Sequence, residues 1–361
     1  MLEVAEVNRA DRMENWLRQA QATQEDGWHR RDALEMLTLQ SQIFGFNLRV
    51  ETNYAPILEA TRLALMRFTM GPPHTAERPM ELRILVWDES DADTPAVRPE
   101  AERQFPTCRH DAHRDWAAID LGVDGHCAID LARRLAVVFL SRSLADQTEY
   151  VARFVVSTAL LNILTRCRLV QWHAAALVKD DRTLLLAGTD NSGKSATAFT
   201  LLQSGYRMLG ESVTYTRRQA DRIEVMGFPV GHLRLRQDGV SLFPTWAPLG
   251  QPIAGDDERK WLFDLIRILP ESVHRESLLT AHLSMLFVEV GKSDETEVRH
   301  LGLDEAMVRA IPICSFWEEP RRAQTTLREV ERTLRRVRAY QVRVGRDAAG
   351  VVQAVDALLT S

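Results

Sequence analysis

The chain has 361 residues and a formal net charge of −5, with 45% hydrophobic and 26% charged residues. The length excludes a minidomain and suffices for two domains with buried cores, and the composition is near the average for soluble proteins. A net negative charge gives no electrostatic reason to expect nucleic-acid binding, so we expect a small-molecule or protein partner.

The four cysteines are scattered, without a C-x-x-C pair or zinc-ligand spacing, which favours a reducing cytoplasm. The first residues mix charges and lack the apolar core of a secretory signal. No later stretch reaches the roughly 18 uncharged apolar residues of a membrane span. These features predict a cytoplasmic protein with no membrane partner.

Residues 1–45 carry apolar side chains at helical spacing without a proline, which predicts an N-terminal helical arm. A small α+β domain is expected over residues 46–145, with recognition of the substrate that accepts the phosphoryl group as its expected role. Its predicted elements, in chain order, are a strand at 46–50, a helix at 55–67, a strand at 81–87, an acidic loop at 88–103 and a hairpin with arms at 116–121 and 125–130.

A long apolar helical pattern over residues 146–168 is expected to bridge the two halves. Residues 173–179 and 183–187 then predict a β-hairpin with a turn at Asp180 and Asp181. The second hairpin strand runs straight into residues 188–195, which fit the phosphate-binding pattern G-x-x-x-x-G-K-[ST] without a mismatch.

The flanks of this motif support a nucleotide site, because a strand must deliver the loop and a helix must leave it with free N–H groups aimed at phosphate. Lys194 is expected to reach the β and γ phosphates, and the Ser195 hydroxyl to ligate Mg²⁺. The predicted cofactors are therefore ATP and Mg²⁺. The residues expected to contact the nucleotide are Gly188, Asp190, Asn191, Ser192, Gly193, Lys194, Ser195 and Ala196.

Glu211 follows Lys194 by only 17 positions. Most P-loop NTPases place the magnesium-associated acid several tens of residues later, after a crossover to a parallel strand. The short spacing indicates a different family of phosphate-loop enzymes.

The run from His173 to Tyr215 resembles the catalytic domain of HPr kinase/phosphorylase, which shares a core with phosphoenolpyruvate carboxykinase. The matching features are His173, the loop, the pair Gly205-Tyr206 and the run Gly210-Glu211-Ser212. Related kinases, including those that phosphorylate a serine of ribosomally made peptides, are similar over residues 141–361. The chain departs from the family at Ser212, where a second aspartate is typical, and it lacks a clear counterpart of the glycine-rich signature tied to the phosphorylase reaction.

The resemblance implies an α/β fold whose C-terminal domain, residues 146–361, is an HPr-kinase-like P-loop kinase domain with a mixed sheet. Glu211 then acts as general base or sits beside the metal, with a solvated strand end as the alternative. The His173 imidazole is expected near the γ-phosphate, as a hydrogen-bond donor or proton carrier, or else it is a hydrogen-bonded structural histidine. Arg234 and Arg236 share one strand face, which is expected to contact phosphate or an acidic substrate, with solvent as the alternative. Lys260 is expected to stabilise charge at the phosphates from a mobile loop, with an exposed loop lysine as the alternative.

Two further clusters have simpler interpretations. The run from Cys108 to His113 holds metal-ligand types, but such pairs in a polar loop more often bind nothing. The arginine-rich segment from Arg321 onward also contains glutamates, which predicts a surface helix with i,i+4 ion pairs rather than a nucleic-acid patch.

The predicted activity is transfer of the γ-phosphoryl group of ATP to a hydroxyl, most simply a serine of a peptide or small protein. A hydroxylated metabolite as acceptor, or a nucleotide-binding regulator that has lost catalysis, are the alternatives. A homo-oligomer is left open by the sequence.

Overall fold

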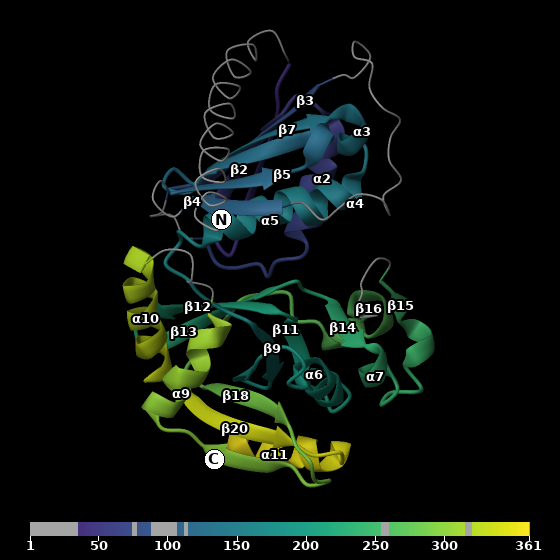
Figure 1. Cartoon of the computed structure of the whole chain (residues 1–361), viewed down its shortest axis with the longest axis vertical. Coiled ribbons are helices and arrows are strands. Elements are labelled where there is room, and N and C mark those ends of the chain that lie inside the picture. The colour runs from purple at the N-terminus through teal and green to yellow at the C-terminus, as the bar shows by residue number, and fades with distance from the viewer. Residues whose placement is uncertain are drawn as a thin grey trace, which may run out of the picture. The chain divides into compact units, whose positions relative to one another are not determined.

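The computed structural model describes residues 35–73, 78–87, 107–111, 115–253, 260–314 and 320–360. By its internal contacts the chain divides into two units. Unit 1 comprises Met1–Leu65 and Pro73–Cys167, and unit 2 comprises Met66–Pro72 and Arg168–Ser361. The protein is a mixed α/β protein, and each unit has its own sheets (Figure 1).

Unit 1 is built on a mixed sheet. Its strands, from edge to edge, are β1 (Leu37–Ile43), β2 (Phe46–Thr52), β3 (Met80–Trp87), β7 (Leu135–Ser141), β6 (Gly125–Asp130), β5 (Trp116–Asp120) and β4 (Thr107–Asp111). The predicted strands at 46–50 and 81–87 and the hairpin at 116–130 are confirmed. The helical prediction is wrong over 37–43, because these residues alternate in exposure and pair with β2 as an antiparallel hairpin. Residues 1–34 and the acidic loop at 88–103 lie outside the described residues.

The predicted long helix at 146–168 forms, with a π-helical stretch at Val151–Val156 between α4 (Thr148–Tyr150) and α5 (Ser157–Leu164). It packs against α2 (Ala55–Leu65) and against β6 and β7. These contacts assign it to unit 1, so the division between units falls after Cys167 rather than at residue 146. The short helix α3 (Arg142–Ala145) precedes it, capped by the Ser141 hydroxyl.

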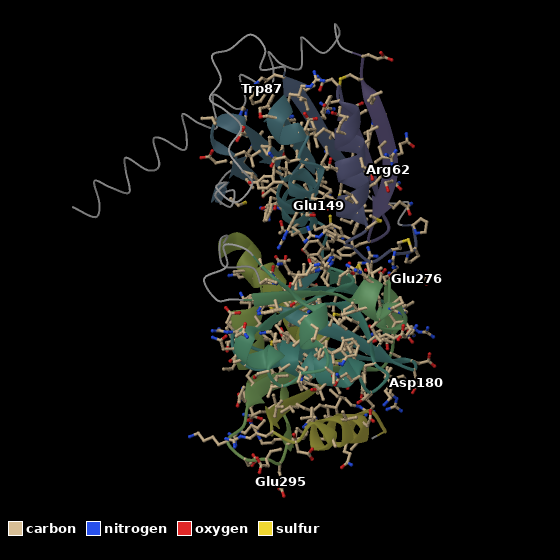
Figure 2. All side chains as sticks on the ribbon, turned by 90° about the vertical axis from the view of Figure 1, so that its right-hand side faces the viewer. Arg62, Trp87, Glu149, Asp180, Glu276 and Glu295 are labelled. Carbon is tan, nitrogen blue, oxygen red and sulfur yellow. The ribbon has the colours of Figure 1, made fainter. Side chains whose placement is uncertain are left out.

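Unit 2 contains the sheet that delivers the phosphate loop. Its strands, from edge to edge, are β11 (Arg207–Gly210), β9 (Ala174–Lys179), β10 (Arg182–Ala187), β18 (Leu283–Val290), β20 (Arg338–Val344) and β19 (Glu297–His300). Strands β10, β18 and β20 are parallel to one another, whereas β9 pairs antiparallel with β10. The hairpin predicted from the sequence is therefore confirmed, and Asp180, labelled in Figure 2, takes a positive φ of 53° in its turn.

The apolar run Leu184–Ala187 of β10 is buried on both faces of this sheet, as expected for a central strand with parallel pairing. Leu184 and Leu186 face a core that includes α6 (Lys194–Leu202) and α11 (Ala348–Thr360). Leu185 and Ala187 face a second core that includes α9 (Leu303–Ala310) and α10 (Pro320–Leu334). The surface helix predicted from Arg321 onward is thus α10, and its i,i+4 pair Arg335–Glu331 is present.

Two smaller antiparallel sheets complete unit 2, together with the short helices α7 (Gln237–Val240) and α8 (Leu265–Ile268). One sheet has the order β17 (Leu278–Thr280), β13 (Arg222–Phe228), β12 (Val213–Gln219) and β8 (Val170–Trp172). The other has the order β14 (His232–Arg236), β16 (Lys260–Asp264) and β15 (Gln251–Pro252). In the part of the chain that the structure describes, no helix is long and apolar enough to cross a membrane.

Candidate phosphate-binding site

The loop between β10 and α6 is shaped by its two glycines. Gly188 has a φ of 155°, and a Cβ there would lie 2.6 Å from Ser192 Oγ and 2.9 Å from the Val288 carbonyl oxygen. Gly193 has a φ of 94°, which other residues rarely adopt, and it is the N-cap of α6. Both positions therefore require glycine. At both of them the loop backbone lies close to Val288, and at Gly193 also to Val290, at the end of β18.

The first turn of α6 presents unused N–H groups. Gly193 has no side chain to cap them, and the first helical backbone bond runs from Thr197 N–H to the Gly193 carbonyl. Within the described residues, the amides of Lys194, Ser195 and Ala196 consequently have no acceptor. An uncapped helix start of this kind combines open donors with the positive end of the helix dipole, so it favours an anion.

The Lys194 ammonium lies within the same loop. Its Nζ donates to the carbonyl oxygens of Gly188 and Thr189, each at 2.8 Å. Burial lowers the pKa of Lys194, while the negative charges of Asp190 and Glu211 act in the opposite direction. Glu211 is thus close enough to Lys194 to influence it electrostatically.

Glu211 follows β11 and is a buried carboxylate, only 6% exposed. Arg234 of β14 binds it in a fork: Nε and Nη2 each donate to Oε2 at 3.1 Å, and the Arg234 backbone N–H donates to Oε1 at 3.2 Å. The alternative of a solvated strand-end residue is therefore wrong. The alternative of a solvated face is also wrong for Arg234, since its guanidinium holds Glu211 and also donates to the Ser212 hydroxyl at 3.1 Å.

A carboxylate also stands on the parallel neighbour of β10, where many P-loop NTPases carry their acid. Glu289 of β18 shares the sheet face of Phe287 and Met285, which pack on α9 and α10. Its oxygens accept from Arg309 of α9 and, at 2.7 Å, from Gln341 Nε2 of β20. Because α6 packs on the opposite face, Glu289 faces away from the phosphate loop, and Glu211 is the carboxylate on the loop side.

His173 lies between β8 and β9, with its Nε2 at 3.5 Å from Asp190 Oδ1 in the loop. Burial lowers the pKa of His173, and the Lys194 charge lowers it further, while Asp190 and Glu211 oppose the shift. The imidazole is therefore neutral near pH 7. His173 thus lies close enough to the charged groups of the loop and to Glu211 for their charges to influence its pKa.

The β14–β16 strand pair flanks the loop. Arg236 Nη1 donates to Asn191 Oδ1 in the loop. Lys260 is the residue directly opposite Arg236 in the antiparallel ladder, so the two cations share one face. Lys260 therefore opens strand β16, and its assignment to a loop was wrong. Residues 260–264 read Lys-Trp-Leu-Phe-Asp without polar–apolar alternation, so their strand is defined by pairing with β14 and not by a sequence signal.

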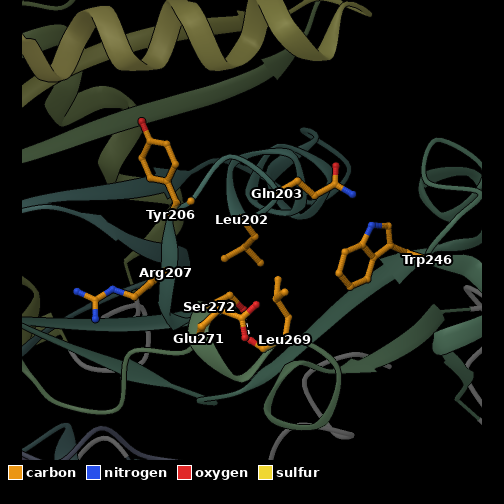
Figure 3. A pocket seen from close by; sticks show the side chains of 9 residues that line it. Leu202, Gln203, Tyr206, Arg207, Trp246, Leu269, Glu271 and Ser272 are labelled. Carbon is orange, nitrogen blue, oxygen red and sulfur yellow. Dashed lines mark hydrogen bonds between the residues drawn. The ribbon is translucent and has the colours of Figure 1, made fainter.

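A cavity of about 520 Å³ lies elsewhere in unit 2, at the C-terminal end of α6. Its walls include Leu202, Trp246 and Leu269, with Arg207 and Glu271 at its polar margin (Figure 3). The nine residues of α6 separate this cavity from the phosphate loop by about 13 Å. It is therefore distinct from the site at the start of the helix.

Comparison with known proteins gives limited information. No protein-family model matches the sequence, and no curated protein matches it. Among solved structures, the chain is similar to the Hpr(Ser) kinase/phosphatase from Coxiella burnetii, with 14% sequence identity, over 46% of this chain and 98% of that chain, at a TM-score of 0.23. A superposition at this TM-score is no evidence for a shared activity.

Proposed function

We propose that the chain is an ATP-dependent kinase that transfers the γ-phosphoryl group to a hydroxyl, and that the acceptor is a serine of a peptide or small protein. One observation carries this proposal. Helix α6 begins without a cap at Gly193, and the buried carboxylate of Glu211 lies close enough to influence the charge of Lys194 in the same loop. Phosphoryl transfer requires little more than charge neutralisation, positioning and a group that orients the nucleophile. The site supplies a candidate for each.

The donor set suits the phosphates of ATP. The open amides of α6 and the Lys194 ammonium are the phosphate-binding groups, and the Ser192 hydroxyl is buried in the loop with no hydrogen-bond partner among the residues that the structure describes. In the described residues no group of three metal-ligating side chains exists, which agrees with Mg²⁺ bound through few protein ligands plus phosphate oxygens and water. Ser195 is the residue that would hold the metal, and Glu211 would either join it or act as the general base.

When bound, ATP with Mg²⁺ supplies the phosphoryl group and offsets its charge. Glu211 would take the proton from the acceptor hydroxyl as the hydroxyl oxygen bonds to the γ-phosphorus and the bond from that phosphorus to the bridging oxygen breaks, which releases ADP. A carboxylate offers about four lone-pair directions, and Arg234 occupies three of them, so Oε1 keeps one free for that proton. Neutral His173 and Asp190 would orient the tip of the loop.

Incubation with γ-labelled ATP, Mg²⁺ and candidate peptides encoded beside this gene tests the proposal. Lys194→Ala is expected to abolish ATP binding. Glu211→Gln is expected to keep ATP affinity while transfer falls by about 10²-fold, the scale of general-base loss. Transfer that is unchanged in Glu211→Gln removes the catalytic role of Glu211.

Arg234 donates three hydrogen bonds to the Glu211 carboxylate, which leaves that carboxylate fewer free lone pairs to accept a proton. This contact favours a second candidate function, a nucleotide-binding regulator without transfer activity. A regulator binds ATP in a Lys194-dependent way but neither hydrolyses it nor phosphorylates any acceptor. Measuring binding and turnover on the same preparation separates the two functions. A small hydroxylated metabolite as acceptor is tested in the same assay by replacing the peptides.

A further inference from the structure

A second group of cations lies in unit 2, at the ends of the central strands opposite to the phosphate loop. Arg182 opens β10, Arg338 opens β20, and Arg336 comes two residues before Arg338. Together with His282, Ser284 and the end of α11, they line a cavity of about 80 Å³. The six residues of β10 separate this cavity from the loop by about 17 Å.

The strand register brings these side chains to one face of the sheet. Ser284 of β18 pairs with Leu184 of β10 and with Arg338 of β20. Arg182 is two residues before Leu184, so its side chain points to the same face. This is the face on which α11 packs, and Leu358 and Leu359 at the end of that helix close the cavity.

Among the described residues, no carboxylate neutralises the positive charges at this cavity, because none of the described residues that line it is acidic. Across the described parts of the chain, the side chains of Arg182 and Arg338 have no hydrogen bond or ion pair, and the Arg336 guanidinium donates from Nη1 to the Ala220 carbonyl at 2.7 Å. Arg336 and Arg338 are exposed and Arg182 is half-buried, so water screens their mutual repulsion, and an anion held among the three cations would add a net attraction.

Ser284 provides an independent observation. It is only 6% exposed, it lines the cavity, and its hydroxyl has no hydrogen-bond partner among the described residues. The hydroxyl is reached by solvent within the cavity, so water can satisfy it there, and a ligand that accepts hydrogen bonds can replace that water. A ligand that accepts hydrogen bonds would satisfy this hydroxyl and the guanidinium groups together.

We infer that this cavity, the β10–β20 anion site, binds a tetrahedral oxyanion: inorganic phosphate or the phosphate group of a small phosphomonoester. A volume of about 80 Å³ is well below the roughly 300–1,000 Å³ of pockets that enclose a whole small ligand, and it suits one such group. Planar guanidinium groups bind phosphate through paired N–H donors. This inference does not rest on the proposed kinase activity.

The test uses full-length Lys194→Ala protein, so that the phosphate loop does not contribute. Inorganic phosphate and glycerol 3-phosphate are titrated separately and followed by calorimetry and ³¹P NMR. One saturable site is expected for each, and the ligand that binds more tightly identifies the source. Adding Arg182→Gln or Arg338→Gln is expected to weaken binding at least about tenfold, and Ser284→Ala by a smaller factor.

Arg335→Gln is the matched control, because Arg335 neighbours Arg336 in sequence but pairs with Glu331 and does not line the cavity. It is expected to leave phosphate binding unchanged. The melting temperature of each variant, measured without phosphate, checks its folding. Removing one of several neighbouring positive charges should not lower this temperature. The inference is overturned if the Lys194→Ala protein shows no saturable site with a Kd below about 10 mM, or if Arg182→Gln and Arg338→Gln bind like the control.

Discussion

At the scale of single residues, Glu211 and Arg234 form one unit. The carboxylate side chain is 4% exposed, and the guanidinium that neutralises it is 36% exposed at the edge of the site. A buried carboxylate without its partner would be strongly destabilising, so Arg234 fixes both the charge and the direction of Glu211. Arg234 is therefore a positioning residue for the proposed reaction.

Arg234→Lys tests this role, because lysine keeps the charge but cannot form the two-pronged bond to Oε2. We expect kcat for phosphoryl transfer to fall at least about tenfold while ATP affinity changes little. Arg236→Lys is the matched control on the same strand face. Since Arg236 contacts Asn191 of the loop, its substitution should affect ATP affinity instead. Equal kcat in wild type and Arg234→Lys would contradict the positioning role.

His173 makes stability depend on pH. Burial and, secondly, the Lys194 charge lower the pKa of His173, so the folded protein favours the neutral imidazole. As pH falls below about 6.5, the unfolded chain takes up a proton that the folded chain resists, and the free energy of unfolding decreases. His173→Gln should lose less stability than wild type between about pH 7.5 and about pH 5.5 in urea unfolding. The free energy of unfolding of His173→Gln should still fall somewhat with decreasing pH, since burial also lowers the pKa of His126 and His274. An equal fall in wild type and His173→Gln would contradict the role of His173.

At the scale of elements, the sequence predicted the parts of the site that depend on local chain geometry. The β9–β10 hairpin, the glycine loop and α6 are contiguous, and their patterns of turn residues and apolar spacing specify them without distant partners. The interactions of Arg234 and Lys260 were not predictable in the same way. They depend on the pairing of β14 with β16 and on the packing of β14 beside Glu211, which are contacts between distant segments. Strand β1 was missed for a related reason, because its alternation becomes meaningful only once β2 pairs with it.

Helix α11 is attached to the sheet by a partly buried polar contact. Tyr206, 1% exposed, donates its hydroxyl to Asp356 Oδ1 at 2.5 Å, and Lys179 Nζ donates to the same carboxylate at 2.8 Å. The Lys179 ammonium also lies 4.7 Å from the Tyr206 ring centroid. These contacts join α11 to β9 and to the turn after α6.

Tyr206→Phe removes the hydroxyl and leaves the ring in place. Because Asp356 is partly exposed and keeps Lys179, we expect a loss of about 1 kcal/mol in the free energy of unfolding. Tyr340→Phe is a suitable control, since Tyr340 is also buried but its hydroxyl has no hydrogen bond among the described residues. Urea unfolding measures both. A loss in Tyr340→Phe as large as that in Tyr206→Phe would contradict a specific role for this contact.

At the scale of the whole molecule, the division into units does not follow the chain order. The segment Met66–Pro72 leaves unit 1 and becomes part of unit 2. Thr69 N–H donates to the Gly227 carbonyl at 3.2 Å, Met70 N–H donates to the Arg275 carbonyl at 2.8 Å, and the Phe68 ring lies 4.4 Å from that of Phe228. A fragment that begins at Arg168 therefore lacks a piece of its own core.

Phe68→Ala tests whether unit 2 depends on this segment. Phe68 is 4% exposed, and removing a buried phenylalanine ring typically costs about 3–5 kcal/mol, so unit 2 should be strongly destabilised. Hydrogen exchange followed by mass spectrometry is expected to show lost protection in β12 and β13, with β2 and β3 of unit 1 unchanged, because the lost contacts belong to unit 2 alone. Met66→Ala is the matched control, since the Met66 side chain is 57% exposed in the same segment and should leave both units protected. Equal loss of protection in both units would mean that they unfold as one cooperative body, and the assignment of this segment to unit 2 alone would then be wrong.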